Sequence, residues 1–121
     1  MILVDTSVWV DHFRNVEPHL QDLLTSRQVL CHPFVIGELA LGNLRDRAIA
    51  LRHLGRLPPA VVAKNGEVLA MIESSGLAGR GIGYVDAHLL AAVRLCGARL
   101  WARDKRLVTV AAELDASYDA T

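Results

Sequence analysis

With 121 residues, of which 52% are hydrophobic and 21% charged, the chain is long enough for one folded domain, residues 1–121, and too short for two independent cores. This composition excludes an intrinsically disordered polypeptide, and the longest apolar stretches are far shorter than a membrane span. The net charge of zero gives no indication of a nucleic-acid partner, although 11 of the 13 basic residues are arginines. Cys31 and Cys96 lie at no metal-binding or redox spacing, which indicates reduced thiols in a soluble cytoplasmic protein.

The N-terminal half begins with the apolar run Ile2–Val4, which ends at Asp5. This pattern is typical of a buried strand followed by the start of a helix. Val8, Trp9 and Phe13 then recur at helical spacing and predict the first helix. Further helices are expected at about 17–26, 33–42 and 45–54, and a short strand at 28–31.

The C-terminal half continues this alternation of short apolar runs and helical patterns. A third strand is expected at 60–63 and a fourth at 98–102, with helices at about 67–75, Tyr84–Cys96 and 104–114. Four glycines punctuate a loop between 76 and 83, and the last seven residues are expected to be an edge strand or a frayed end. Such alternation predicts an α/β three-layer domain, with a parallel sheet covered by helices on both faces.

Two acids directly follow predicted strands. Asp5 comes after the first strand, and Asp104 comes after the strand that contains Leu100 and Trp101. Each of these aspartates also suits the N-cap of the helix that follows it. Because sites in parallel α/β sheets lie at the carboxyl ends of the strands, both acids are also candidates for chemistry.

Two further acids fall on apolar helix faces. Glu38 shares a face with Val35 and Leu41, and Asp86 precedes Leu89 by three residues on another apolar stripe. A carboxylate that points into a core is costly unless it is paired or bound to a metal. A buried salt bridge to an arginine is therefore the structural alternative for both.

A parallel sheet would bring these four acids to one edge. Several carboxylate oxygens at one place fit Mg²⁺ or Mn²⁺, whereas the scattered histidines and cysteines support no zinc site. Metal ions held by acids alone are typical of enzymes that cleave phosphodiester bonds. The chain has no nucleophile elbow, no Ser–His–Asp order and no P-loop, so the parts needed for acyl transfer and nucleotide hydrolysis are missing.

Four motifs, which together span essentially the whole chain, resemble in sequence and order those of the PIN-domain family, and within it those of the VapC-type toxin ribonucleases. ILVDTSVWVDHF resembles the family's opening strand and helix, with Asp5 as the first metal acid and Ser7 as its hydrogen-bonding companion. FVIGELALG places the glutamate role on Glu38, YVDAHLLAAV places the central ligand on Asp86, and LWARDKRL places the fourth acid on Asp104.

The resemblance implies a sheet of four or five parallel strands, a homodimer and a cognate antitoxin that covers the active site, giving a toxin–antitoxin hetero-oligomer. It also implies an Mg²⁺- or Mn²⁺-dependent endoribonuclease that leaves 3′-hydroxyl and 5′-phosphate ends. Ala102 stands where many relatives have Thr or Ser, and Arg106 stands where a further acid is frequent. The sequence around the fourth ligand, Asp104, therefore departs from the family pattern at two positions. Arg14, Arg80 and Arg103 flank the motifs and are candidates for RNA contacts, with a solvated surface as their alternative.

Three competing interpretations each fail at a named feature of the sequence. A phosphoryl receiver domain needs an adjacent acidic pair after the first strand, but here Thr6 follows the single acid Asp5. A phosphatase of the haloacid dehalogenase type needs a second aspartate two places after the first, where this chain has Ser7. A PIN fold that binds RNA without cleaving it is expected to lack at least one of the four acids, and all four are present in this chain.

Overall fold

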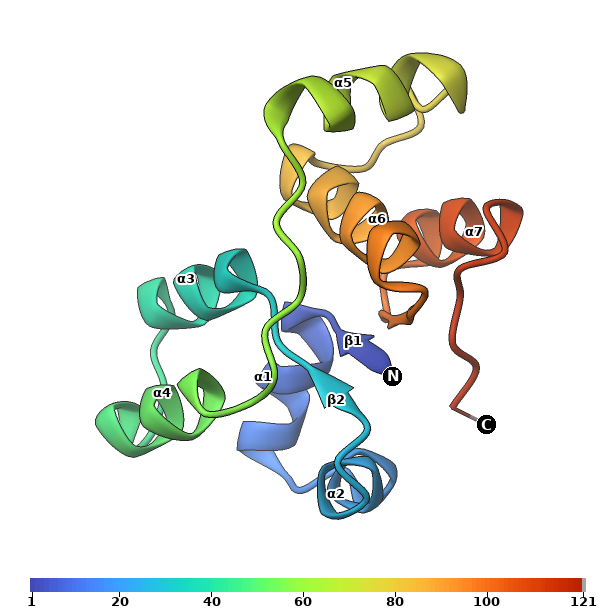
Figure 1. Ribbon diagram of the computed structural model, residues 1–121. Coiled ribbons are helices and arrows are strands. Elements are labelled where there is room, and N and C mark those ends of the chain that lie inside the picture. Colours follow the sequence, from blue (N-terminus) through green and yellow to red (C-terminus); the bar gives the residue numbers. More distant parts are fainter. Residues whose placement is uncertain (121) are drawn as a thin grey trace.

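The computed structural model describes residues 1–120. Within that range, three short parallel strands form a sheet in the order β2-β1-β3 (Figure 1). The strands are β1 (Ile2–Val4), β2 (Val29–Leu30) and β3 (Arg99–Trp101), and helices connect them along the chain. The predicted α/β class, with a parallel sheet flanked by helices, is confirmed.

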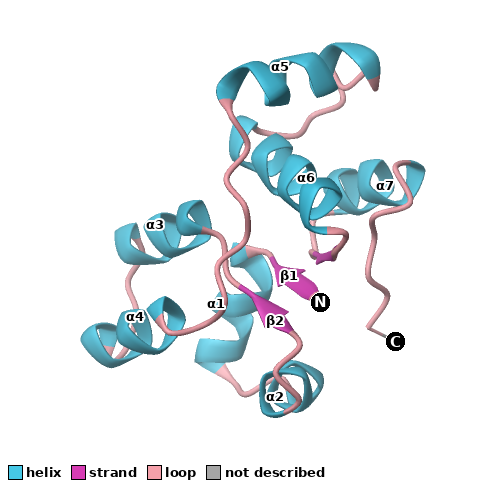
Figure 2. Ribbon diagram, viewed as in Figure 1, coloured by secondary structure: helices cyan, strands magenta, loops and turns pink. Residues whose placement is uncertain are grey.

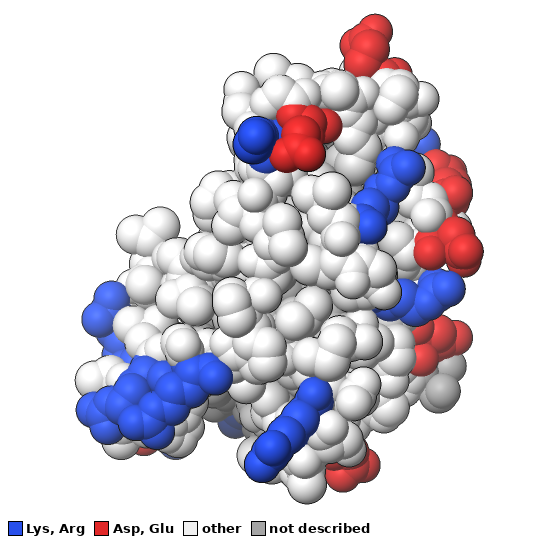
Figure 3. Space-filling view, viewed as in Figure 1, with Lys and Arg blue, Asp and Glu red and all other residues white. Residues whose placement is uncertain are grey.

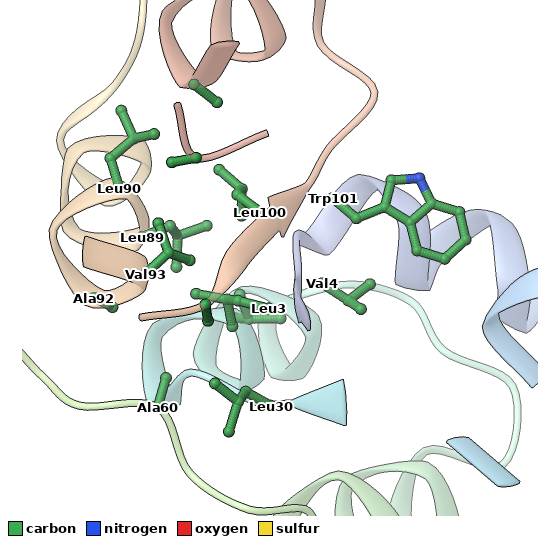
Figure 4. Close-up of a cluster of buried hydrophobic side chains, with 14 of the residues drawn as sticks. Leu3, Val4, Leu30, Ala60, Leu89, Leu90, Ala92, Val93, Leu100 and Trp101 are labelled. Carbon is green, nitrogen blue, oxygen red and sulfur yellow. The ribbon is translucent and has the colours of Figure 1, made fainter. Parts of the chain in front are cut away.

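The side chains of the two longer strands alternate between the faces of the sheet. Leu3 lies opposite Leu100, and Val4 lies opposite Trp101. Leu3 and Leu100 point toward α6 (Tyr84–Cys96), whereas Val4 and Trp101 point to the other face (Figure 4). There the ring of Trp101 contacts the edge of His19 on α2 (Pro18–Thr25), with ring centroids 5.4 Å apart. Apolar layers therefore cover both faces, as expected for a buried parallel sheet.

Every predicted helix is present. Pro18 and Pro33 occupy the first turns of their helices, where the missing N–H costs nothing. Gly97 ends α6 in the left-handed region at φ 63°. The remaining helices are α1 (Thr6–Arg14), α3 (Pro33–Leu41), α4 (Arg47–Gly55), α5 (Asn65–Ser74) and α7 (Lys105–Glu113).

The predicted strand at residues 60–63 is wrong. This segment is part of the loop that joins α4 to α5 (Figure 2), and the nearest bridge in the described chain is the one between Cys31 and Pro59, just before the segment. Val61 and Val62 are about half exposed, so the β-branched run has no neighbouring strand to pack on. The C-terminal segment likewise makes a single bridge, from Ser117 to Leu100. The sheet in residues 1–120 thus has three strands instead of four or five.

The tryptophans and cysteines have structural roles. Trp9 and Trp101 are buried in the core. Both cysteines are free; Cys31 is buried, which raises its pKa to about 11, and Cys96 is only partly buried. Among residues 1–120, no helix combines the length and the apolar character needed to cross a bilayer.

Candidate functional site

Three helices begin at the carboxyl-end edge of the sheet, and three of the predicted acids lie at their first turns. Asp5 follows β1 as the N-cap of α1, and its backbone N–H donates to the carbonyl of Trp101 at 2.9 Å. Asp104 is the N-cap of α7, and Asp86 is the third residue of α6. The N-cap roles expected for Asp5 and Asp104 are confirmed, and the caps direct both carboxylates to this edge.

Asp5 is the most buried of the four acids, with 8% of its surface exposed. Its Oδ2 accepts hydrogen bonds from the hydroxyl of Ser7 at 2.6 Å and from the Ser7 backbone N–H at 3.2 Å. The predicted pairing of Ser7 with Asp5 is therefore present. Two donors fix the direction of this carboxylate.

Glu38 does not lie on a buried face, contrary to the prediction. Its side chain is exposed, because Phe34 and Leu41 on the same stripe are exposed as well, while Val35 and Leu39 face the core. Glu38 still reaches the site, since its Oε1 accepts a 2.6 Å hydrogen bond from the hydroxyl of Thr6 in α1. This bond joins α3 to the helix that carries Asp5.

Asp86 lies partly buried among the other acids. Burial raises its pKa above the ordinary value, and the negative charges of Asp5, Glu38 and Asp104 raise it further. The backbone N–H of Gly83, which donates to Oδ2 at 2.9 Å, opposes this shift without cancelling it. The influence of all three acids on one carboxyl group indicates that the four belong to a single electrostatic cluster.

Asp104 is exposed, and its Oδ1 accepts the N–H groups of Arg106 and Leu107 at 3.0 and 3.1 Å. Within residues 1–120, none of the ion pairs involves Asp5, Glu38, Asp86 or Asp104, so the alternative of a buried salt bridge fails. Each of the four uses one carboxylate oxygen for its hydrogen bonds and has its second oxygen without a donor in the described chain.

The cluster is not a closed metal cage. In the part of the chain that the structure describes, no three His, Cys, Asp or Glu side chains converge closely enough to hold an ion as they stand. Carboxylates that share a site without a countercharge repel one another, which favours this separation. The donor set nevertheless fits a hard divalent cation, because all four groups offer a free oxygen at one edge of the sheet.

Of the three arginines predicted to contact RNA, two are held by carboxylates. Arg80 makes a bidentate ion pair with Glu113 at 2.8 Å. Arg103 contacts both Asp11 and Glu17, at 2.8 and 3.2 Å. Arg14 makes no ion pair with a described residue and lines a pocket that also contains Glu38.

Sequence reasoning missed two residues that hold the acids of the site. Thr6 follows Asp5 directly, but its contact with Glu38 joins residues 32 positions apart and leaves no sequence signal. Gly83 supplies the N–H that holds Asp86.

The fold and these motifs define a PIN domain: the family model described as "PIN domain" matches residues 2–113. The chain therefore belongs to the PIN-domain family. Among characterised relatives, it is 49% identical over 114 residues to Ribonuclease VapC32 of Mycobacterium tuberculosis, an alignment that covers 93% of this chain and 92% of the relative. These matches confirm the resemblance to VapC-type members of the family.

Solved structures support the same fold. The chain is similar to FitAcB from Neisseria gonorrhoeae, with a TM-score of 0.65, 21% identity and coverage of 99% of this chain and 98% of that chain. It is also similar to PAE2754 from Pyrobaculum aerophilum, with a TM-score of 0.58, 22% identity and coverage of 90% and 78%.

Proposed function

We propose that the chain is the toxin of a bacterial toxin–antitoxin pair and acts as a metal-dependent endoribonuclease. The observation that carries this proposal is the clustering of Asp5, Glu38, Asp86 and Asp104 at one sheet edge. The 49% identity to a VapC ribonuclease supports RNA as the substrate. The chain has an acid at each of the four acidic positions of the family motifs.

Mg²⁺ or Mn²⁺ is the cofactor we propose, with Asp5 and Asp86 as its principal ligands and Glu38 and Asp104 completing the set. An all-oxygen donor set suits these ions, and each carboxylate keeps one oxygen free of protein donors among residues 1–120. A bound ion would supply the positive charge that activates water and neutralises the departing oxygen.

The chain's own part in the reaction is to orient the acids and the phosphate. Ser7 fixes Asp5, Thr6 fixes Glu38 and the N–H of Gly83 fixes Asp86. The N-termini of α1, α6 and α7 lie at the same edge, and their partial positive charges favour an anionic phosphate there.

The proposal includes a cognate antitoxin, a homodimer and a cytoplasmic location. A second copy is supported by exposed apolar residues on three helices: Phe34 on α3, Leu69 on α5, and Tyr84 and Leu95 on α6. The rings of Phe34 and Tyr84 both contact His88, each with centroids 4.7 Å away, so α3 and α6 contribute to one surface. The two free cysteines support a reducing compartment.

Induced expression in a bacterial host tests the proposed activity. We expect the wild-type chain to arrest growth and Asp86→Asn to relieve the arrest at equal protein level, because the central ligand is lost. Asp22→Asn, the same chemical change at an exposed position of α2, should remain toxic. Purified wild-type protein should cleave RNA with Mg²⁺ or Mn²⁺ and not in EDTA. An Asp86→Asn variant as toxic as the wild type would refute the proposal.

A further inference from the structure

A pocket of about 670 Å³ adjoins the acidic cluster and shares Glu38 with it. Its walls come from α1, from the end of α3 and from the loop that leads to α4. Val10, Phe13 and Leu44 form an apolar side, and Arg14 and Arg45 form a basic one. A volume of this size is within the range of ligand sites, roughly 300–1,000 Å³.

The two arginines of the pocket are free to bind an external anion. Within residues 1–120, neither Arg14 nor Arg45 lies in an ion pair, whereas Arg80, Arg99 and Arg103 each have a carboxylate partner. Both guanidinium groups are exposed. Guanidinium groups bind phosphate oxygens in a bidentate manner, so an exposed unpaired set beside a phosphodiester site fits nucleic acid.

The basic surface continues from the pocket onto α4. Arg47, Arg52 and Arg56 are exposed, and in the described chain none of them is paired with an acid. Figure 3 shows Lys and Arg side chains gathered over α4, on a surface that carries few acids nearby. A chain with zero net charge therefore presents a positive region that begins beside its acidic cluster.

We propose that this pocket binds one unpaired nucleotide of the RNA substrate, next to the phosphodiester bond that is cleaved. Arg14 and Arg45 contact its phosphate, and the base packs against Phe13 and Leu44. Proteins recognise single-stranded RNA in this way, with apolar or aromatic walls for the base and cations for the backbone. This inference rests on the proposed ribonuclease function.

The position of the pocket favours RNA over an acidic peptide as its occupant. An RNA whose phosphate lies at the acids continues on both sides of the cleaved bond, so it must cross the surface around Glu38. Four carboxylates repel such a polyanion, and adjacent arginines offset that repulsion. An acidic peptide has no phosphodiester bond to place at the acids, so nothing requires it to cross this surface.

Cleavage and binding of short single-stranded RNA oligonucleotides with randomised sequence test the inference. We expect Arg14→Gln and Arg45→Gln each to raise KM roughly tenfold with little change in kcat, as for other backbone and base contacts. The double variant should lower the slope of log binding constant against log salt by about 0.7, since the two arginines contact one phosphate and each neutralised phosphate contributes about 0.7 for single strands. Phe13→Leu, which keeps an apolar wall, should change the base preference beside the cleaved bond.

Arg27→Gln is the matched control, because Arg27 is exposed at the amino end of β2, at the opposite edge of the sheet. It should leave KM, base preference and salt slope unchanged. Arg14 and Arg45 variants that behave like wild type, while Asp86→Asn is inactive, would overturn the inference and leave the proposed function intact. Variants that weaken antitoxin binding but keep full RNA affinity would assign the pocket to the antitoxin instead. RNA cleavage equal in wild type and Asp86→Asn would reject the proposed function, and the binding data would still decide the role of the pocket.

Discussion

Replacing Asp86 by asparagine should stabilise the metal-free protein while abolishing RNA cleavage. The pKa of Asp86 is raised by burial and by the charges of Asp5, Glu38 and Asp104, so the fold disfavours its ionised form. Asparagine has nearly the same shape and still offers an oxygen to the N–H of Gly83. The substitution therefore removes unfavourable interactions and keeps most of the favourable one.

The magnitude follows from the balance of these interactions. Repulsions between partly exposed charges contribute about 0.2–1 kcal/mol each, so the three that are removed amount, together with the cost of burying the charge, to about 2 kcal/mol. Against this, a neutral acceptor is weaker than a carboxylate by about 1 kcal/mol at the Gly83 hydrogen bond. A net gain of about 1 kcal/mol corresponds to an increase in Tm of roughly 3–5 °C for a domain of this length.

Thermal unfolding in EDTA, followed by circular dichroism over a range of pH, measures the effect. A raised carboxyl pKa means that the folded protein binds more protons than the unfolded chain. Stability of the wild type should fall as pH rises from the unfolded pKa of Asp86 through its raised folded pKa, and the advantage of Asp86→Asn should grow over the same window. Added Mg²⁺ or Mn²⁺ should raise the Tm of the wild type and narrow the difference.

Asp22→Asn is the control for a general effect of net charge, because Asp22 is an exposed acid on α2. Its Tm should stay close to that of the wild type. An Asp86→Asn variant that melts several degrees below the wild type in EDTA would refute the reasoning, because it would make Asp86 a structural partner whose charge the fold needs.

Three other perturbations have defined outcomes. Ser7→Ala removes the 2.6 Å hydrogen bond to Asp5 and should weaken Mn²⁺ binding 10- to 100-fold, as loss of ligand-orienting groups does. Ser7→Thr keeps the hydroxyl and should bind Mn²⁺ like the wild type. A Ser7→Ala variant with an unchanged Mn²⁺ titration would contradict this expectation. Burial lowers the pKa of His32 to about 4, so the free energy of unfolding should fall by up to about 3 kcal/mol as pH decreases from 6.5 to 4. His32→Asn keeps an acceptor for the Phe34 N–H and should make the free energy of unfolding depend less on pH in this range, as measured by acid unfolding. Arg80→Gln should leave the midpoint of denaturant unfolding close to that of the wild type, because its ion pair with Glu113 lies at the surface. It should also leave KM for RNA unchanged, because Glu113 holds the guanidinium; a higher KM would show that Arg80 contacts RNA.

The helices could be predicted from the sequence because local signals specify them. Pro18 and Pro33 mark helix starts, Gly97 marks an end, and apolar periodicity fills the segments between. The strand expected at residues 60–63 failed because strand formation depends on a neighbour. Its valines have the right β propensity, but the chain leaves the sheet after a single bridge and exposes them.

The convergence of the acids at one sheet edge could also be predicted, but the contacts among their neighbours could not. Asp5 and Asp104 follow strands, and parallel topology alone sends both to one edge. The burial assigned to Glu38 was wrong because helical periodicity does not say which of two apolar stripes meets the core. The Thr6–Glu38 hydrogen bond depends on how α1 packs against α3, which is a tertiary property.

The topology explains how ordinary helix caps become a candidate metal site. An aspartate at a helix N-terminus is common, because it accepts backbone N–H groups and favours the helix dipole. Here three helices start at the same sheet edge, so their capping groups Asp5, Asp86 and Asp104 lie in one electrostatic cluster. Each cap uses one carboxylate oxygen and leaves the other without a donor among residues 1–120, and the helix N-termini offset part of the repulsion. The backbone that stabilises each acid separately also brings the acids together, so their mutual repulsion destabilises the fold when no cation is bound. A bound cation would remove that repulsion and stabilise the fold.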